Sequence, residues 1–339
     1  MSTERDNRMV WDGRPGHYEV WYTTLSHRAS KTGFWIRYTL RAPVTGRGEP
    51  YAQLWFARFD AARPEDNFGI HTRRPITELV SNNEPFAIRI GSCETRQDGL
   101  RGSIAGDGHE ASWDLSWTPA SETHHHLPTV LYKGSLGDTK VLSPNLVVPT
   151  RGHITVDGRR YEFDGDPAGQ THLWGKKHAY HWAWSHVNAF DGGEHAAFES
   201  ITARLKRGAV ILPKMTAFTL YLDGEKLDFR EPWRIPFNRS DYATGHLHII
   251  GVGAETRVEA SFDCRPQDMI LTEYVDPDGD AAFCHNTCAG NVKIVVKRRS
   301  PFVGRWKEDR TLTATGTAHW EWGARAGDIA NVKRIHIAV

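Results

Sequence analysis

Residues 33–59, GFWIRYTLRAPVTGRGEPYAQLWFARF, contain two alternating segments on either side of a turn at Thr45-Gly46. Both segments are rich in β-branched and aromatic residues, and their polar and apolar side chains alternate with the period of two that is typical of strands. Similar segments recur at 111–117, 216–223, 256–263 and 291–298. Asp-Gly turns separate several of them, and the only helical candidates are short pieces near 75–81 and 266–271. The pattern predicts an all-β protein built from antiparallel strands.

A weak internal repeat indicates two barrels. Residues 19–40 and 180–205 each contain a Trp-bearing strand, a Ser-His pair, a polar turn and a second alternating strand. The repeat distance is about half of the 339 residues, a length that suits two domains. Residues 143–149, SPNLVVP, read as an extended linker with few hairpin signals. We therefore predict two consecutive antiparallel β-barrels, at residues 1–150 and 151–339.

Charge and hydropathy exclude several classes of partner. The chain has 42 basic and 41 acidic residues, and neither sign forms a long run. This balance argues against nucleic acid or an anionic membrane surface as the main partner. The first residues are polar, and no stretch approaches the roughly 18 apolar residues of a spanning helix. We expect a cytoplasmic protein without a transmembrane segment, and the oligomeric state stays open.

No motif predicts a metal or a cofactor. Gly251-Val252-Gly253 lacks the third glycine of a dinucleotide loop and precedes a strand pattern rather than a helix. Four cysteines are too few for a disulfide scaffold, and Cys284 and Cys288 lack a second ligand pair. His124–His126 reads as a solvated loop, and Asp276–Asp280 reads as a hairpin turn rather than a calcium site. The expectation is a protein that needs neither metal nor cofactor.

The segment 181–188, HWAWSHVN, predicts a ligand pocket. Because side chains alternate across a strand, Trp182, Trp184, His186 and Asn188 share one face, and small residues take the other. Aromatic rings and hydrogen-bonding groups on one face suit the wall of a ligand cavity. A Trp-rich core with satisfied polar groups is the alternative.

Glu199 is the candidate acid. It shares a strand face with Ile201, Ala203 and Leu205, all apolar. A carboxyl group among apolar side chains resists ionisation, so its pKa is expected to rise, as a general acid requires. Aromatic faces nearby would stabilise a carbocation by roughly 0.5–2 kcal/mol each. The alternative is a structural glutamate paired with His or Arg.

Three patches resemble one family of proteins. They are Ser143-Pro144 followed by GHITVDG at 152–158, His172-x-Trp174-Gly175, and Trp182-x-Trp184-x-His186-x-Asn188-x-Phe190. They resemble the double-lipocalin (calycin) superfamily that includes carotenoid 1,2-hydratase, tocopherol cyclase, pericyclase-type cyclases and the attachment-type proteins. The resemblance implies two lipocalin-like barrels with a site near their junction. It also implies that His172 and Trp174 belong to that site, with Glu199 as the nearest acidic residue.

The leading hypothesis is a cofactor-independent hydro-lyase that hydrates, dehydrates or isomerises an isoprenoid or terpenoid alkene or alcohol. In this hypothesis Glu199 is the acid and His172 or His186 handles water. The substrate-binding residues are Trp174, Trp182, Trp184, Asn188 and Phe190. The alternatives are an intramolecular terpenoid or polyketide cyclase and a non-catalytic carrier of a hydrophobic ligand.

Overall fold

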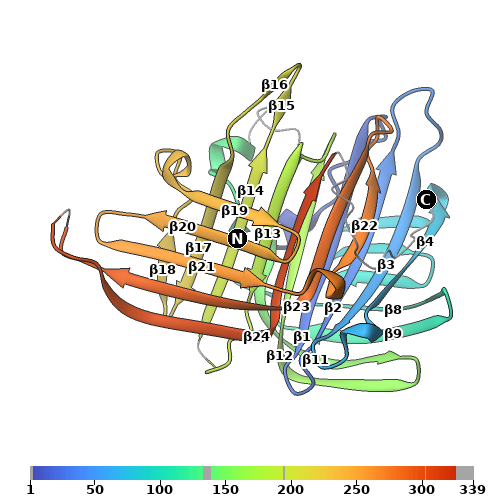
Figure 1. Ribbon diagram of the computed structural model, residues 1–339. Helices are drawn as coiled ribbons and strands as arrows, with labels where there is room; N and C mark the ends of the chain where they lie inside the picture. Colours follow the sequence, from blue (N-terminus) through green and yellow to red (C-terminus); the bar gives the residue numbers. More distant parts are fainter. Residues whose placement is uncertain (1–2, 133–138, 194, 302, 326–339) are drawn as a thin grey trace.

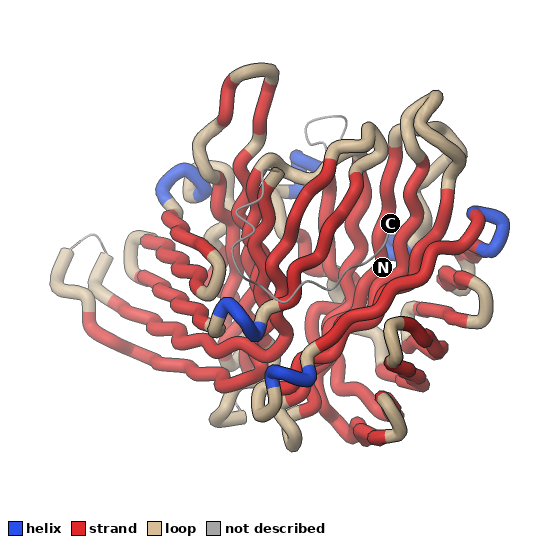
Figure 2. The backbone as a smooth tube through the Cα atoms, turned by 45° about the vertical axis from the view of Figure 1, so that its right-hand side comes forward, coloured by secondary structure: helices blue, strands red, loops and turns tan. Residues whose placement is uncertain are grey.

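A computed structural model describes residues 3–132, 139–193, 195–301 and 303–325 (Figure 1). The described chain is almost wholly β-structure, and its helices are short single turns (Figure 2). These turns are η1 (Thr3–Asn7), η2 (Pro64–Asp66), η3 (Ile76–Glu78), η4 (Thr129–Tyr132), η5 (Ile235–Phe237) and η6 (Pro266–Asp268). Two of them, η3 and η6, lie where the sequence predicted helical pieces.

The first sheet is antiparallel and nearly closes on itself. Its strands, in spatial order, are β4 (Phe68–Pro75), β3 (Tyr51–Asp60), β2 (Thr32–Ala42), β1 (His17–His27), β12 (Arg159–Gly175), β11 (Thr139–Val156), β9 (His109–Trp117), β8 (Gly99–Gly106), β7 (Cys93–Arg96), β6 (Phe86–Ile90) and β5 (Leu79–Asn83), and β10 (His124–His125) pairs with β11. Phe68 of β4 stacks on His109 of β9 with 3.9 Å between ring centroids. The sheet therefore curls until strands far apart in its order pack together.

The second sheet repeats this topology. Its order is β18 (Glu225–Asp228), β17 (Met215–Leu222), β14 (Ala196–Arg204), β13 (His181–Val187), β24 (Lys307–Ala324), β23 (Ala281–Arg298), β21 (Thr256–Asp263), β20 (His246–Val252) and β19 (Arg239–Ala243), and β22 (Ile270–Val275) pairs with β23. In both sheets the first long strand pairs with the last one, as β1 pairs with β12 and β13 with β24. The all-β prediction is confirmed, and the hairpins β1–β2 and β13–β14 correspond to the internal repeat.

The first sheet extends to Gly175, so the expected boundary near 150 falls inside β11. Residues 151–175, which the sequence assigned to the second barrel, pair with β1 and β9. The register of β11 against β12 shifts between Leu142 and Asn145 and again between Asn145 and Val148. These irregularities interrupt the alternation, and for this reason the middle of a strand resembled a linker. Residues 326–339, the end of the predicted second domain, lie outside the described residues.

The two sheets pack directly against each other. Gly33 of β2 lies on β23, where a Cβ atom would come within 2.1 Å of the Cys288 carbonyl oxygen. An apolar cluster crosses the interface, with Trp35, Trp55 and Phe59 from the first sheet and Trp182 and Tyr274 from the second. Close packing of two backbones therefore places β1 and β2 beside β13, β22 and β23 (Figure 1).

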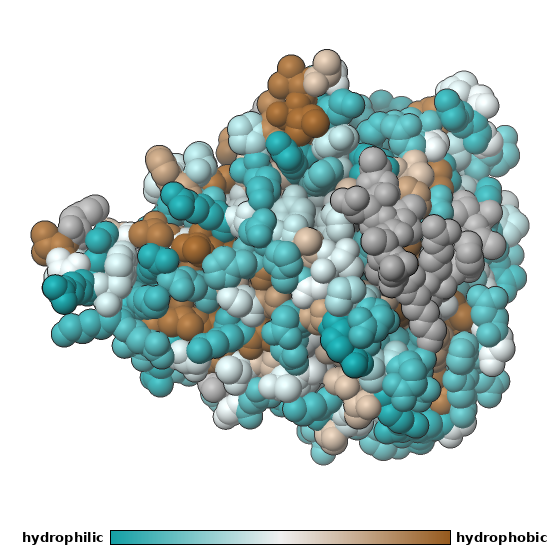
Figure 3. Space-filling view, in the orientation of Figure 1, coloured by the Kyte–Doolittle hydropathy of each residue, from teal (hydrophilic) through white to brown (hydrophobic). Residues whose placement is uncertain are grey.

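The visible surface is mostly polar (Figure 3). An apolar group stands out at the top of that view, over the hairpin β15 (Lys206–Arg207) and β16 (Val210–Ile211). Val210 is 61 % exposed. In the described part of the chain, no helix is long and apolar enough to cross a membrane.

Candidate active site at the junction of the barrels

A mainly apolar cavity of about 320 Å³ lies between the two sheets. β1, β2 and β12 supply one wall, and β13, β14 and β17 supply the opposite wall. Its aromatic lining residues are Tyr18, Tyr22, Trp35, Trp182, Trp184 and Tyr274. This volume is at the lower end of the range for small-molecule sites, and the position agrees with the junction site that the resemblance implied.

Strand alternation places two of the predicted tryptophans in this cavity. Trp182 and Trp184 line it, whereas Ala183 and Val187 point to the other face and join the core of the second sheet. On the neighbouring strand, Ile201 lines the cavity opposite Trp184. The predicted separation of the two faces of β13 is therefore present in the structure.

Glu199 lies in a closed polar cluster beside the cavity. It is 1 % exposed and is not among the cavity-lining residues. Trp184 Nε1 donates to Glu199 Oε1 at 2.6 Å, and His186 Nδ1 lies 2.6 Å from Oε2. His126 Nδ1 is 3.3 Å from Oε1. Polar partners, rather than the apolar wall expected from the strand pattern, surround this carboxyl group.

The His124–His126 segment was expected to be solvated, but two of its three imidazoles are buried. His126 is 1 % exposed, and its Nε2 lies 3.0 Å from Ser143 Oγ. Burial lowers the pKa of His126 to about 4 and moves that of His124 well below its usual range. Both imidazoles are therefore neutral at pH 7. Strand β10 makes this burial possible because it pairs with β11 near Glu199, a contact that no local pattern shows.

His172 anchors the N-terminal segment. Its Nδ1 lies 2.8 Å from the Asp6 carbonyl oxygen, and its Nε2 lies 2.8 Å from Glu19 Oε1. Burial alone would raise the pKa of Glu19, but hydrogen bonds from His17 and His172 outweigh it and lower this pKa to about 2. Trp174 packs on His172 with 4.7 Å between ring centroids. Because oxygen acceptors take both ring nitrogens, neither is left for a substrate or water.

The remaining predicted residues lie away from the cavity. His186 is buried, and its Nε2 faces the backbone at Gly169. Phe190 belongs to the core of the second sheet. Asn188 is 5 % exposed and lines a separate, more open pocket with His124 and Tyr221. The structure therefore brings Trp182 and Trp184 together with the cavity but not His172, Trp174, Asn188 or Phe190.

Glu321, which the sequence analysis did not single out, is the one carboxylate among the described residues that line the cavity. It lies on β24, where Trp182 Nε1 donates to its Oε1 at 2.9 Å and Asn286 Nδ2 donates to its Oε2 at 2.9 Å. Trp182 can lie flat over β24 because its cross-strand neighbour is Gly323, where a Cβ atom would meet the indole ring at 2.1 Å. Glu321 is thereby fixed beside the aromatic wall.

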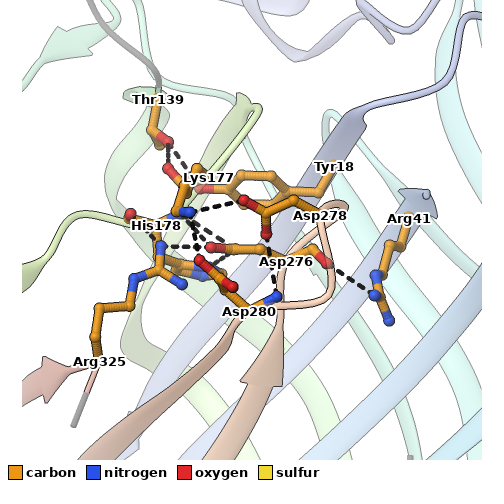
Figure 4. Close-up of polar contacts among 9 residues, drawn as sticks. All are labelled: Tyr18, Arg41, Thr139, Lys177, His178, Asp276, Asp278, Asp280 and Arg325. Atoms are coloured by element: carbon orange, nitrogen blue, oxygen red, sulfur yellow. Dashed lines mark hydrogen bonds and ion pairs between the residues drawn. The ribbon is translucent and has the colours of Figure 1, made fainter. Parts of the chain in front are cut away.

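His178 lines the cavity with its imidazole ring. It lies in the connection between β12 of the first sheet and β13 of the second. Its ring lies between those of Tyr18, at 4.8 Å, and Tyr274, at 5.1 Å. Its Nδ1 is 2.6 Å from Asp276 Oδ1, and Arg325 forms an ion pair with the other oxygen (Figure 4). Burial alone would raise the pKa of Asp276, but His178 and Arg325 outweigh it and lower this pKa. The Asp276 carboxylate therefore accepts from Nδ1–H, which leaves His178 Nε2 for another partner.

The loop around Asp276 holds this connection in place. Lys177 Nζ bonds to Asp278 at 2.6 Å and to Asp280 at 2.5 Å, and Arg41 donates to the Asp276 carbonyl oxygen at 2.7 Å (Figure 4). The segment 276–280 is a turn, as predicted. Among the described residues, no group of three or more His, Cys, Asp or Glu side chains is arranged to hold a metal ion.

Comparison with known proteins identifies the family. Residues 140–323 match the tocopherol cyclase-like family, so the chain belongs to that family. An uncharacterized protein of Mycobacterium tuberculosis, found in strains CDC 1551 / Oshkosh and ATCC 25618 / H37Rv, is 26% identical over 320 residues. That match covers 93% of this chain and 88% of the mycobacterial protein.

Solved structures share the fold. An AttH-type protein from Nitrosomonas europaea aligns with a TM-score of 0.57 at 15% identity, covering 95% of this chain and 96% of its own. Kievitone hydratase from Nectria haematococca aligns with a TM-score of 0.53 at 11% identity, covering 96% of both chains. The chain is similar in fold to these proteins over nearly all of its length, and the double-lipocalin resemblance predicted from the sequence is confirmed.

Proposed function

We propose that this protein is an enzyme of the hydratase or cyclase type that acts on a hydrophobic, isoprenoid-like alkene or alcohol in the junction cavity. The observation that carries the proposal is the position of Glu321, a carboxyl group fixed by Trp182 at a mainly apolar cavity wall. Membership of the tocopherol cyclase-like family and the fold shared with kievitone hydratase support the same reaction class.

The cavity wall suits a cationic intermediate. The Trp35, Trp182 and Trp184 side chains line it, and aromatic faces attract a desolvated cation. Burial raises the pKa values of Tyr22 and Tyr274 well above the usual phenol range, so both rings stay neutral at pH 7. A cation formed here would therefore contact several aromatic rings, with Glu321 as the only carboxylate among the described lining residues.

The proposed reaction is the addition of water across a carbon–carbon double bond, or its reverse. Glu321 in its protonated form gives its proton to an alkene carbon, which leaves a tertiary cation beside Trp182 and Trp184. A water molecule bonds to the cation carbon and gives one proton to His178 Nε2. Proton exchange with solvent returns both groups to their starting states. Asp276 acts as a positioning residue because it orients the imidazole.

Glu199 has a different role in this proposal. Its two oxygens hold the Trp184 indole and the His186 ring, so it fixes one aromatic wall without touching the substrate. The sequence-based assignment of Glu199 as the acid and this assignment of Glu321 predict different activity losses. The two glutamine variants therefore distinguish them.

The test is product analysis with a panel of acyclic terpenols and the corresponding alkenes in water enriched in oxygen-18. Hydration predicts one labelled hydroxyl group per product, and dehydration predicts loss of the hydroxyl oxygen. An intramolecular cyclase, which the same cation chemistry supports, predicts ring products without the label. Binding without turnover of any substrate would contradict an enzymatic role and favour a carrier.

A further inference from the structure

Arg37 is a buried cation at the cavity. It lies on β2, is 6 % exposed, and lines the cavity beside Trp35. Its guanidinium carbon lies 4.4 Å from the ring centroid of Tyr274, 5.5 Å from that of Trp55 and 5.6 Å from that of Trp35. Three aromatic rings therefore surround a charge that is largely removed from water.

The Arg37 guanidinium has few hydrogen-bond or ion-pair partners in the protein. Its Nε donates to Thr39 Oγ1 at 2.9 Å. With the described residues, its terminal nitrogens form no hydrogen bond and no ion pair with a carboxylate. A comparably buried arginine, Arg58, donates to the Asp66 carbonyl oxygen at 2.9 Å and lies 3.7 Å from its carboxylate. Burial of an unpaired charge is costly, and aromatic faces offset only part of that cost.

The other cations at the cavity already have partners. Lys177 Nζ binds Asp278 and Asp280, and His178 Nδ1 faces Asp276. Among the described residues, Arg37 is therefore the cavity-lining cation without a carboxylate partner.

A small hollow of about 20 Å³, with both polar and aromatic lining, adjoins the cavity at Arg37. Thr39, Arg41 and Gln53 line it, and the exposed Glu273 contributes to its edge. This volume has room for about one water-sized group. A carboxylate is small enough to place one oxygen in this hollow and the other in the cavity.

We propose that Arg37 binds the carboxylate of the substrate, so that the substrate class is an isoprenoid-type carboxylic acid with an apolar body in the cavity. The planar guanidinium matches a carboxylate through two parallel N–H donors. This proposal rests on the proposed function, because it assigns the substrate of the same cavity. Its test, however, measures binding and does not require turnover.

The experiment compares farnesoic acid with farnesol by calorimetric titration at pH 8, where the acid is ionised and the apolar tails match. The wild-type protein should bind the acid at least about tenfold more tightly, the amount expected for a hydrogen-bonded charge pair. Arg37→Met should abolish this preference, and Arg37→Lys should keep part of it. Equal wild-type affinities, or a preference that survives in Arg37→Met, would overturn the proposal.

Arg58→Met is the matched control. Because removal of an unpaired buried charge is neutral or stabilising, the Tm of Arg37→Met should be equal to or above that of the wild type. Arg58→Met removes the hydrogen bond to the Asp66 carbonyl oxygen and the ion pair with its carboxylate, which keeps only Arg63 as a partner among the described residues, so its Tm should fall while its preference for the acid stays. A clear fall in the Tm of Arg37→Met would show that Arg37 has a structural partner. An acid preference without turnover would retain this proposal and contradict the enzymatic one.

Discussion

Two glutamates in the second sheet each accept an indole N–H from tryptophans that are two residues apart on β13. Trp184 donates to Glu199 on β14, and Trp182 donates to Glu321 on β24. Because β13 lies between β14 and β24, its two tryptophans reach diagonal neighbours on opposite sides. The same pairing occurs twice, but the surroundings of the two carboxyl groups differ.

The difference lies in what else each carboxyl group meets. Glu199 is 1 % exposed, has the imidazoles of His186 and His126 beside it, and does not line the cavity. Glu321 also contacts Asn286 and the Cys284 thiol, and it borders the cavity. A buried carboxyl group beside a tryptophan is therefore insufficient to indicate catalysis, because access to a substrate decides its role.

The largest effect is expected for turnover in the two glutamine variants. Glu321→Gln keeps the shape of the side chain but removes the transferable proton, so the rate should fall by roughly 10²–10⁴-fold. Glu199→Gln should keep more than about a tenth of the wild-type rate. Steady-state kinetics with any substrate found in the product analysis measures both. The opposite order of losses would restore Glu199 as the acid.

A second prediction concerns the position of the Trp182 indole ring at the cavity wall. Gly323→Ala puts a methyl group where the indole ring now lies, so Trp182 and its hydrogen bond to Glu321 must move. Small displacements of catalytic groups can cost about 100-fold in rate. Gly106→Ala is the control, because its Cβ atom would meet Ile70 at an ordinary 3.6 Å in the first sheet. Equal rates for both variants would show that the position of Trp182 is unimportant.

The free energy of unfolding should fall more in Glu199→Gln than in Glu321→Gln, which is the reverse of the order expected for turnover. In Glu199→Gln the amide NH₂ faces donor groups of Trp184 or His186, so the free energy of unfolding should fall by about 1–3 kcal/mol. Glu321 is only partly buried, so its amide can turn toward the cavity and the loss should be smaller. Urea unfolding of both variants measures the difference. A larger loss for Glu321→Gln would contradict the structural role of Glu199.

The last prediction is a pH dependence that belongs to the Glu199 cluster. The folded-state pKa of His126 is about 4, below the usual 6.5, so the unfolded chain binds a proton first as the pH falls. Between pH 6.5 and about 4 this histidine therefore contributes a loss of about 1.4 kcal/mol per pH unit. His126→Gln should flatten the stability profile in that window. An unchanged slope would show that other histidines with a lowered pKa, such as the partly buried His71, account for it.

Local alternation explains what the sequence determined by itself. A period of two is a property of the extended backbone, so the all-β class, the turns and the shared face of Trp182 and Trp184 followed from the residues alone. The same logic placed Glu199 on the face of Ile201 and Ala203. Alternation within one strand does not indicate which groups of other strands pack against that face.

The tertiary structure decided which groups form the site. Glu321 reaches Trp182 across 139 positions of the chain, and Asp276 reaches His178 across 98. The burial of His126 beside Glu199 and the continuation of β11 past residue 150 likewise depend on pairing between distant strands. Strand pairing and barrel packing bring such residues together through non-local contacts, which leave no periodic signal in the sequence.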